Sequence, residues 1–180
     1  VMRVDPAAMV LETEFGERIR ADVANVIPPQ MAAAIAREAG LANASGWCPV
    51  KPATFESTLV PDIHVIGDAT IAAPMPKSGF VASSHAKQAV ASAAASLAGR
   101  AAPAAVFFNT CYSHVGPDYG ISIVGVFRPQ GDRFIEVEGS GGVSPRTSVL
   151  GAGARDFRRL EATYADGWYE SITRAMFGLA

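Results

Sequence analysis

Gly67 and Asp68 are the residues whose setting most favours ligand chemistry, because they directly follow the short apolar run 63–66. This run is predicted to be a buried strand of a parallel sheet, and a carboxylate at the carboxyl end of such a strand can reach a sugar hydroxyl. The glycine before the acid lets a ligand approach the backbone. The alanine- and serine-rich segment 81–97 contains no Gly or Pro and is predicted to be a helix. Its amino end would direct free amide groups and the positive end of the helix dipole at an anionic atom of the ligand.

Each candidate residue also has a purely structural interpretation. An Asp after a strand is commonly a helix N-cap or a turn residue, and Lys77 in the loop before the helix is equally an ordinary solvated lysine. Cys48 lies between Trp47 and Pro49 and is either a reactive thiol or a small buried hydrophobe. Cys111 lies in an apolar strand and is expected to be inert. The spacing of the two cysteines neither requires nor excludes a disulfide between them.

The composition is that of a folded chain without a basic surface. Of the 180 residues, 49% are hydrophobic and 18% are charged, which is too apolar for disorder. The formal net charge of -2 gives no reason to expect nucleic acid as a partner. No apolar run reaches the roughly 18 residues of a membrane span. The two cysteines and three scattered histidines lack the spacing of a metal site, so no metal is expected.

The first half of the chain contains two kinds of pattern. Residues 1–27 show short alternating strands joined by turn residues, which predicts a small antiparallel β-meander that ends before two consecutive prolines. Residues 28–100 contain a run of good helix formers over 30–39, followed by Gly40 as a plausible helix stop. A loop, the strand 63–66 and the long helix follow.

The second half, residues 101–180, is predicted to be a set of strands followed by one helix. The expected strands span 105–112, 121–127 and 133–138. The expected helix begins at residue 154 and ends at residue 177. It carries apolar side chains at a spacing near three to four residues, which indicates one packed stripe: Phe157, Leu160, Tyr164, Trp168, Ile172 and Met176.

Four stretches of the chain resemble one family of flavoproteins. The run 63–80 (IHVIGDATIAAPMPKSGF) resembles the second flavin-binding motif of enzymes with two dinucleotide-binding domains. The stretches 45–50 (SGWCPV), 109–113 (NTCYS) and 167–169 (GWY) are similar, more closely, to the flavoprotein subunit of flavocytochrome c sulfide dehydrogenase. The similarity covers essentially the whole chain but corresponds to the C-terminal part of that subunit. We therefore expect a fragment, with the first Gly-x-Gly-x-x-Gly motif and the first redox cysteine lying upstream.

The resemblance implies the fold class and the domains. The class is α/β plus α+β, a partial two-dinucleotide-binding-domain flavoprotein fold with a C-terminal antiparallel sheet and helix interface domain. Residues 1–27 would be the tail of an NAD-like nucleotide-binding domain. Residues 28–100 would be the second half of the FAD-binding domain, and residues 101–180 would form the interface domain.

The resemblance also implies a cofactor, FAD, and the residues that hold it. Asp68, with Gly67 before it, matches the aspartate that holds the ribityl chain or its phosphate neighbourhood. Trp168 matches an aromatic residue near the flavin, although a tryptophan on a helical stripe is equally a core residue. The loop and helix start beneath the pyrimidine end of the isoalloxazine ring would be formed by four consecutive residues: Lys77, Ser78, Gly79 and Phe80.

Cys48 matches the C-terminal member of a redox-active cysteine pair beside the flavin. The family mechanism implies that a sulfide ion attacks the disulfide of this pair and that the resulting thiolate passes two electrons to FAD. The flavin would deliver them singly to the haem of a c-type cytochrome subunit. Lys77 and the helix amino end would favour the thiolate over the thiol. Enzymes of this family work in the periplasm, so export is expected.

Two other functions remain open from the sequence. A sulfide:quinone reductase or another flavin-dependent disulfide-reductase-like enzyme would share the fold. The charged segment 156–180 is unlike the apolar amphipathic tail that a quinone enzyme needs at the bilayer. A non-catalytic interface fragment is the third possibility. In every case the chain alone is expected to be inactive, because one nucleotide motif and one cysteine would be missing.

Overall fold

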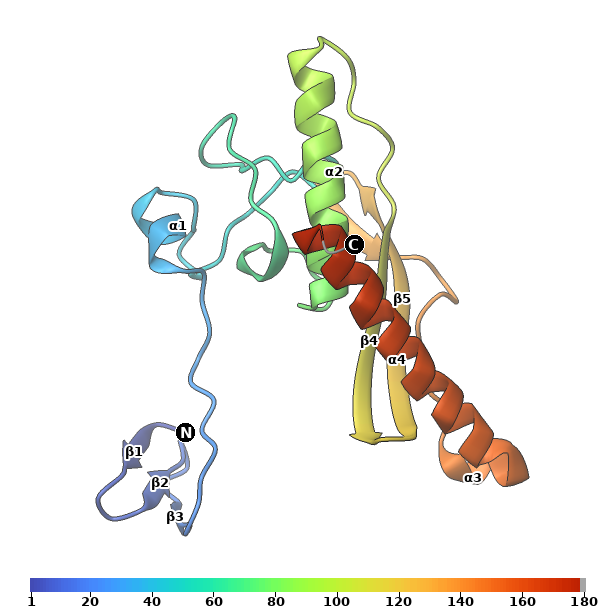
Figure 1. Ribbon diagram of the computed structural model, residues 1–180. Helices are drawn as coiled ribbons and strands as arrows, with labels where there is room; N and C mark the ends of the chain where they lie inside the picture. Colours follow the sequence, from blue (N-terminus) through green and yellow to red (C-terminus); the bar gives the residue numbers. More distant parts are fainter. Residues whose placement is uncertain (179–180) are drawn as a thin grey trace. The chain divides into compact units, whose positions relative to one another are not determined.

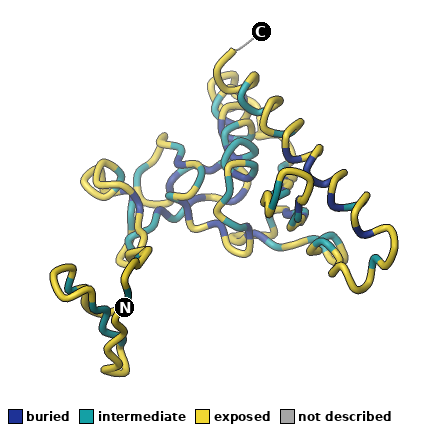
Figure 2. The backbone as a smooth tube through the Cα atoms, turned by 60° about the horizontal axis from the view of Figure 1, so that its bottom comes forward, coloured by how far each residue is buried: buried dark blue, intermediate teal, exposed yellow. Residues whose placement is uncertain are grey.

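The computed structural model describes residues 1–178, and the chain divides into two compact units, Val1–Gln30 and Met31–Ala180. The first unit is an antiparallel meander of three strands, β1 (Arg3–Asp5), β2 (Val10–Glu12) and β3 (Arg18–Arg20) (Figure 1). This confirms the predicted meander, although each strand has three residues. None of residues 1–30 is buried, so the meander has no core of its own (Figure 2).

The helix expected over 30–39 is shorter in the structure, where α1 spans Ala34–Glu38. The residues before α1 are not helical, because the backbone of buried Ala32 makes its hydrogen bonds outside a helix. Its N–H donates to the Gly46 carbonyl at 2.9 Å, and its carbonyl accepts from Arg37 Nε at 3.1 Å. The predicted stop is confirmed, since Gly40 has a φ of 73° that suits glycine after a helix end.

The prediction of a parallel strand at 63–66 is wrong. His64 forms one isolated antiparallel bridge with Glu56, and the other backbone bonds of this segment are Ser57 N–H to Ile63 O at 2.7 Å and Val65 N–H to Phe55 O at 2.9 Å. The segment is also less buried than predicted, since Val65 is buried but Ile63 and Ile66 are 40% and 41% exposed. A run of apolar residues does not show whether a neighbouring strand is present to pair with it. This run has a single irregular neighbour among the described residues, so no ladder forms.

The predicted long helix is confirmed as α2 (Gly79–Leu97), which begins two residues before the expected segment. The antiparallel sheet that follows contains β4 (Phe107–Gly116), β5 (Tyr119–Gln130), β6 (Arg133–Glu136) and β7 (Gly142–Val143), with β5 pairing with the other three. The register of the long hairpin pairs Phe107 with Phe127 and Cys111 with Ile123. Both sheets in residues 1–178 are antiparallel, so the described fold belongs to the α+β class.

The last helix is confirmed as α4 (Ala154–Phe177), preceded by α3 (Thr147–Leu150) and the 3₁₀ turn η2 (Gly151–Gly153). It packs on β4 and β5, and Gly120 of β5 permits the close approach, because a Cβ there would lie 2.5 Å from the Ala162 nitrogen. No described helix is both long and apolar enough to cross a membrane.

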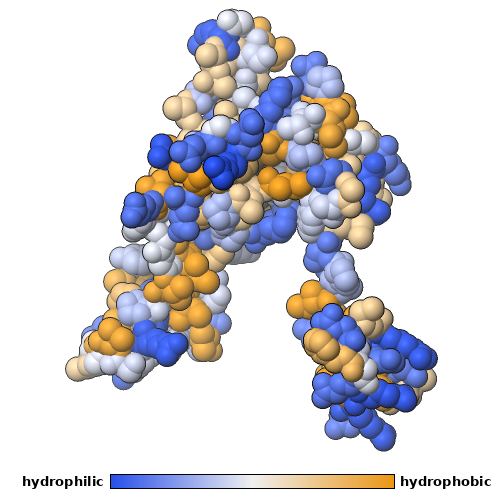
Figure 3. Space-filling model, turned by 180° about the vertical axis from the view of Figure 1, so that it is seen from behind, coloured by the Kyte–Doolittle hydropathy of each residue, from blue (hydrophilic) through white to orange (hydrophobic). Residues whose placement is uncertain are grey.

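The predicted packed stripe of α4 is only partly correct. Phe157, Trp168 and Ile172 are half-buried, whereas Leu160, Tyr164 and Met176 are 48%, 54% and 63% exposed. The face that the sheet covers carries small and charged residues instead: Ala154, Arg158, Glu161, Ala162 and Ala165. Figure 3 shows the opposite face of the molecule from Figure 1, on which apolar side chains also lie at the surface among polar ones.

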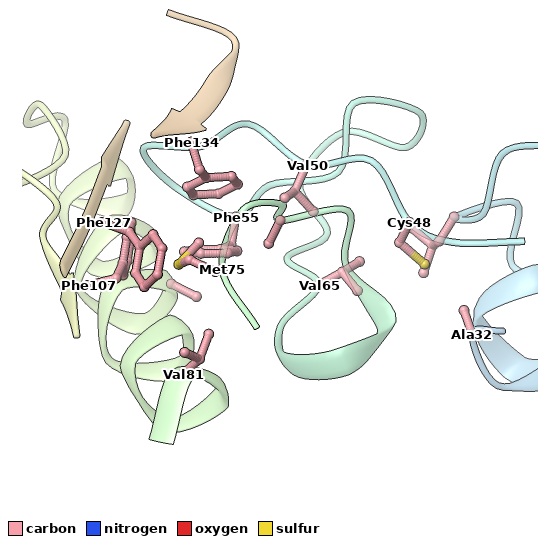
Figure 4. Close-up of a cluster of buried hydrophobic side chains, with 13 residues drawn as sticks. Ala32, Cys48, Val50, Phe55, Val65, Met75, Val81, Phe107, Phe127 and Phe134 are labelled. Carbon is pink, nitrogen blue, oxygen red and sulfur yellow. The ribbon is translucent and has the colours of Figure 1, made fainter. Parts of the chain in front are cut away.

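The core of the second unit joins the middle of the chain to the C-terminal sheet. Phe55 lies against Phe107 and Phe134 with ring centroids 5.3 and 5.6 Å apart, and Phe127 belongs to the same buried cluster. Figure 4 shows these rings together, with Cys48 set apart from them near Ala32 and Val65. The aromatic cluster holds the loop that follows Cys48 against the sheet and so positions the residues considered next.

Candidate functional site

The turn that carries the predicted acid is the 3₁₀ turn η1 (Gly67–Ala69). Gly67 has a φ of 67°, and a Cβ on it would lie 3.3 Å from the Cβ of Ala82 in α2, so the position favours glycine on two grounds. Thr70 closes the turn by donating from its N–H and its hydroxyl to the Gly67 carbonyl, at 3.1 and 2.8 Å. Asp68 is exposed, and its carboxylate borders a pocket of about 200 Å³.

Lys77 lies at the same pocket but is engaged by the protein. Its ammonium donates to the carbonyl of Asp68 and, at 3.2 Å, to that of Thr70. It also lies 3.8 Å from the centroid of the Trp47 ring, a cation–π contact. Partial burial lowers the pKa of Lys77, and the charges of Asp68 and Cys48 offset part of that effect. Lys77 therefore closes the turn as well as placing a positive charge at the pocket.

The start of α2 is fastened to the sheet by two polar side chains. Ser78 is the N-cap, and its hydroxyl accepts from Val81 N–H at 3.1 Å and donates to Asn109 Oδ1 at 2.7 Å. Asn109 is 3% exposed and donates from Nδ2 to the Ile123 carbonyl at 3.2 Å. The first intrahelical bond runs from Ala82 N–H to Ser78 O, so the preceding amide groups are directed out of the helix end.

Aromatic rings bring α4 to the same helix start. Phe80 and Trp168 stack with centroids 5.9 Å apart and an interplanar angle of 11°. Tyr112 of β4 lies 6.4 Å from Trp168, and a Cβ on Gly79 would lie 3.8 Å from the Trp168 ring. Phe80 and Trp168 line a second pocket, of about 510 Å³, between α2, β4 and α4. The structure thus brings Gly79, Phe80 and Trp168 together. It places Gly67, Asp68 and Lys77 at the first pocket, which shares no lining residue with the second.

Cys48 lies behind the first pocket and does not line it. Its exposed fraction is 0%, its N–H donates to Ala69 O at 2.9 Å, and its carbonyl accepts from Ile71 N–H at 2.8 Å. Burial raises the pKa of the Cys48 thiol, and the charge of Lys77 offsets only part of this rise. The expected effect of Lys77 is present, but burial is the stronger influence and favours the thiol. Cys111 is partly buried, and both cysteines are free.

Two residues at this site were not singled out as site residues from the sequence. His85 is 1% exposed and accepts from Gly67 N–H at 3.2 Å, and Asn109 bonds the N-cap. The four-residue spacing of Val81, His85 and Ala89 was available as a signal, because it puts the three on one face of α2. Asn109 begins the stretch 109–113 on which the resemblance partly depends, but its partner is 31 residues away and local spacing does not reveal their bond.

A comparison with protein families identifies the part of the chain that meets this helix start. Residues 103–177 match the family described as flavocytochrome c sulphide dehydrogenase, flavin-binding. The match covers less than half of the chain. It supports the resemblance found in the sequence and points to a flavin cofactor and an oxidoreductase subunit of the flavocytochrome type. Of the predicted site residues, Trp168 lies inside the matched segment, and the other seven lie before it.

The geometry fits a flavin on grounds that the structure itself supplies. A glycine turn approaches α2 closely, and the acid that follows it lines the first pocket. The Gly79 and Phe80 amides precede the first intrahelical bond, next to the stacked rings of Phe80 and Trp168. A carboxylate can accept hydrogen bonds from ribityl hydroxyls, helix amides can donate to the edge of an isoalloxazine ring, and aromatic faces can pack against it. Among residues 1–178 there is no cluster of three or more potential metal ligands.

Proposed function

We propose that the chain is part of an FAD-dependent sulfide dehydrogenase flavoprotein that passes electrons to a c-type cytochrome subunit. The observation that carries this proposal is the contact between the matched segment and the start of α2. Trp168 stacks on Phe80, and Asn109 bonds Ser78, so the flavin-binding family segment meets the flavin-binding motif inferred from the sequence. The remaining walls of the site, with a second redox cysteine, would come from a further part of the same subunit, and export to the periplasm belongs to the same proposal.

The proposed division of labour follows from charge and position. The Gly67 turn would let the cofactor approach the backbone while Asp68 accepts hydrogen bonds from its ribityl hydroxyls. The amides at the start of α2 would face the electron-rich pyrimidine edge, where the helix dipole favours negative charge. Lys77 adds a positive charge nearby. FAD, when bound, supplies the conversion of a two-electron donor into one-electron steps.

The proposed catalytic residue is Cys48. In the first step, hydrosulfide would attack one sulfur of a disulfide between Cys48 and a second cysteine of the subunit. The S–S bond breaks, one cysteine carries the new persulfide, and the other leaves as a thiolate with the electron pair. Because Cys48 is fully buried and its thiol pKa is raised in this structure, this role requires the loop around Cys48 to open toward the pocket.

Flavin binding by the full subunit tests the proposal at Asp68 and Trp168. We expect Asp68→Asn and Trp168→Leu each to weaken FAD binding about tenfold, since each removes roughly 1.4 kcal/mol of contact. The measurement is the dissociation constant from quenching of flavin fluorescence. Asp166→Asn is the matched control, because Asp166 is 70% exposed and pairs with His114 away from the pocket. Unchanged affinity in both site variants, or equal loss in the control, would contradict the proposed site.

A further inference from the structure

His85 occupies the most enclosed position on α2. Its side chain is 1% exposed. The centroid of its ring lies 4.1 Å from that of Phe55 and 5.8 Å from that of Phe107. Val81 and Ala89, one turn away on either side, are buried with it. A polar ring in such a setting must be hydrogen-bonded or it costs free energy.

The hydrogen bond of His85 goes to the turn of the proposed flavin site. Nδ1 accepts from the Gly67 amide at 3.2 Å, across 18 residues of chain. An accepting Nδ1 carries no proton, so the neutral ring must carry its proton on Nε2. Nε2 has no partner among the described residues. Burial, with a smaller effect of Lys77, lowers the His85 pKa to about 4, which keeps the ring neutral and able to accept at pH 7.

This bond matters because it joins the turn to α2, whereas the bonds from Lys77 to the Asp68 carbonyl and from Cys48 N–H to the Ala69 carbonyl come from residues outside that helix. The segment before Gly67 forms no strand and is bonded only to the loop at Phe55–Ser57 among the described residues. Gly67 itself is in a left-handed conformation and approaches α2 at Ala82. His85 is therefore a polar link that fixes the position of the turn relative to α2, and both His85 and Val81 of this helix line the same pocket as the turn.

We propose that His85 is the positioning residue of the Gly67–Asp68 turn, holding its backbone through Nδ1 so that Asp68 is presented at the pocket beside the start of α2. This inference rests on the proposed function for its consequence, flavin affinity. The effect of His85 on the turn does not depend on the proposed function, because the hydrogen bond to Gly67 can be measured without any cofactor.

Three variants of the full subunit separate the hydrogen bond from packing. His85→Phe keeps a ring but removes the acceptor, whereas His85→Asn keeps an acceptor at the position of Nδ1. Phe107→Leu reduces packing against the ring and leaves the acceptor in place. We expect exchange of the Gly67 amide hydrogen to become about tenfold faster in His85→Phe than in Phe107→Leu, with His85→Asn close to the parent. Equal exchange in His85→Phe and Phe107→Leu would overturn the proposal.

The parent protein provides a second test that needs no folded variant. The ¹⁵N shifts of the His85 ring report its tautomer at pH 7. We expect an unprotonated Nδ1 and a protonated Nε2; a proton on Nδ1 would overturn the proposal, because that nitrogen could not then accept from Gly67.

Flavin affinity distinguishes failure of this inference from failure of the proposed function. If His85 positions the site, FAD binding weakens about tenfold in His85→Phe and is largely restored in His85→Asn. A parent that binds no FAD while the Gly67 exchange pattern holds would overturn the proposed function alone. A parent that binds FAD, with His85→Phe and His85→Asn equal to it, would overturn the positioning role alone.

Discussion

The two long helices bury polar side chains in opposite ways. On α2, His85 is neutral and makes one hydrogen bond, to the Gly67 turn. On α4, Arg158 and Glu161 are 4% and 6% exposed and form an ion pair with a 2.7 Å contact. The pair also binds the sheet and the loop before α3 through four further groups: the Ser122 and Ser144 hydroxyls and the Gly120 and Pro145 carbonyls.

The buried ion pair of α4 stabilises the packing of that helix, whereas the buried histidine of α2 positions a turn at the proposed site. The Arg158–Glu161 network ties α4 to β5 and to the loop that carries Ser144, and neither residue lines the two pockets of the proposed flavin site. The His85 bond ties one turn at the pocket and depends on the protonation of a single ring. The comparison therefore predicts that loss of a buried charge on α4 strongly lowers the stability of the protein, whereas the contribution of His85 to stability depends on pH.

The largest expected effect is that of Glu161→Ala. Removing the carboxylate leaves Arg158 buried without a counter-charge and frees two serine hydroxyls, so the free energy of unfolding should fall by about 3–5 kcal/mol. Urea denaturation followed by circular dichroism measures the loss. Asp166→Ala is the control on the same helix, since its pair with His114 is exposed and should contribute less than about 1 kcal/mol. Similar small losses in both variants would remove the contrast between the helices.

The next effect is the pH dependence that His85 confers. Its pKa is about 4 in the folded protein, against an ordinary 6.5. Between these values the unfolded chain binds more protons than the folded one, so stability present above pH 6.5 is lost as the pH falls to about 4. The expected loss is roughly 3 kcal/mol. It is measured as the change in the free energy of unfolding from pH 7 to pH 4, and His85→Asn should show a correspondingly smaller change. Identical pH profiles for the parent and the variant would contradict a neutral buried His85.

The smallest effect is expected at the N-cap of α2. Ser78→Ala removes the acceptor for Val81 N–H and one partner of Asn109, which should cost about 1–2 kcal/mol of stability. Thermal denaturation measures it. Ser83→Ala, within the same helix, provides a matched change that touches no cap and should be nearly neutral. Equal effects of the two changes would show that the cap does not fasten the helix to the sheet.

The elements that the sequence predicts well are those determined by local patterns. The alanine-rich helix, the long hairpin and the final helix follow from residue periodicity and turn residues, and the N-terminal meander does too. The segment 63–66 was mistaken for a strand because strand formation depends on a neighbour that periodicity cannot reveal. The packed face of α4 was misjudged because Arg158 and Glu161 look like solvent-facing residues until their partners in β5 and the loop before α3 are known.

The candidate site shows the same division. The resemblance places Asp68, Lys77 and the start of α2 at one site. In the structure, only the start of α2 contacts Trp168, through Phe80, and no local signal predicts that contact. His85 was missed because a single histidine gives no motif, and its partner lies 18 residues earlier. The burial of Cys48 could not be foreseen either, since a cysteine between Trp47 and Pro49 suits both a core and a reactive position.

The most direct test of the central claim is an experimental structure of the full subunit with FAD. The account predicts that the pyrimidine edge of the isoalloxazine ring lies within hydrogen-bonding distance of the Gly79 or Phe80 amide and that the ribityl chain lies at Asp68. A flavin bound away from the start of α2, with Asp68 and Trp168 making no contact with it, would contradict the account.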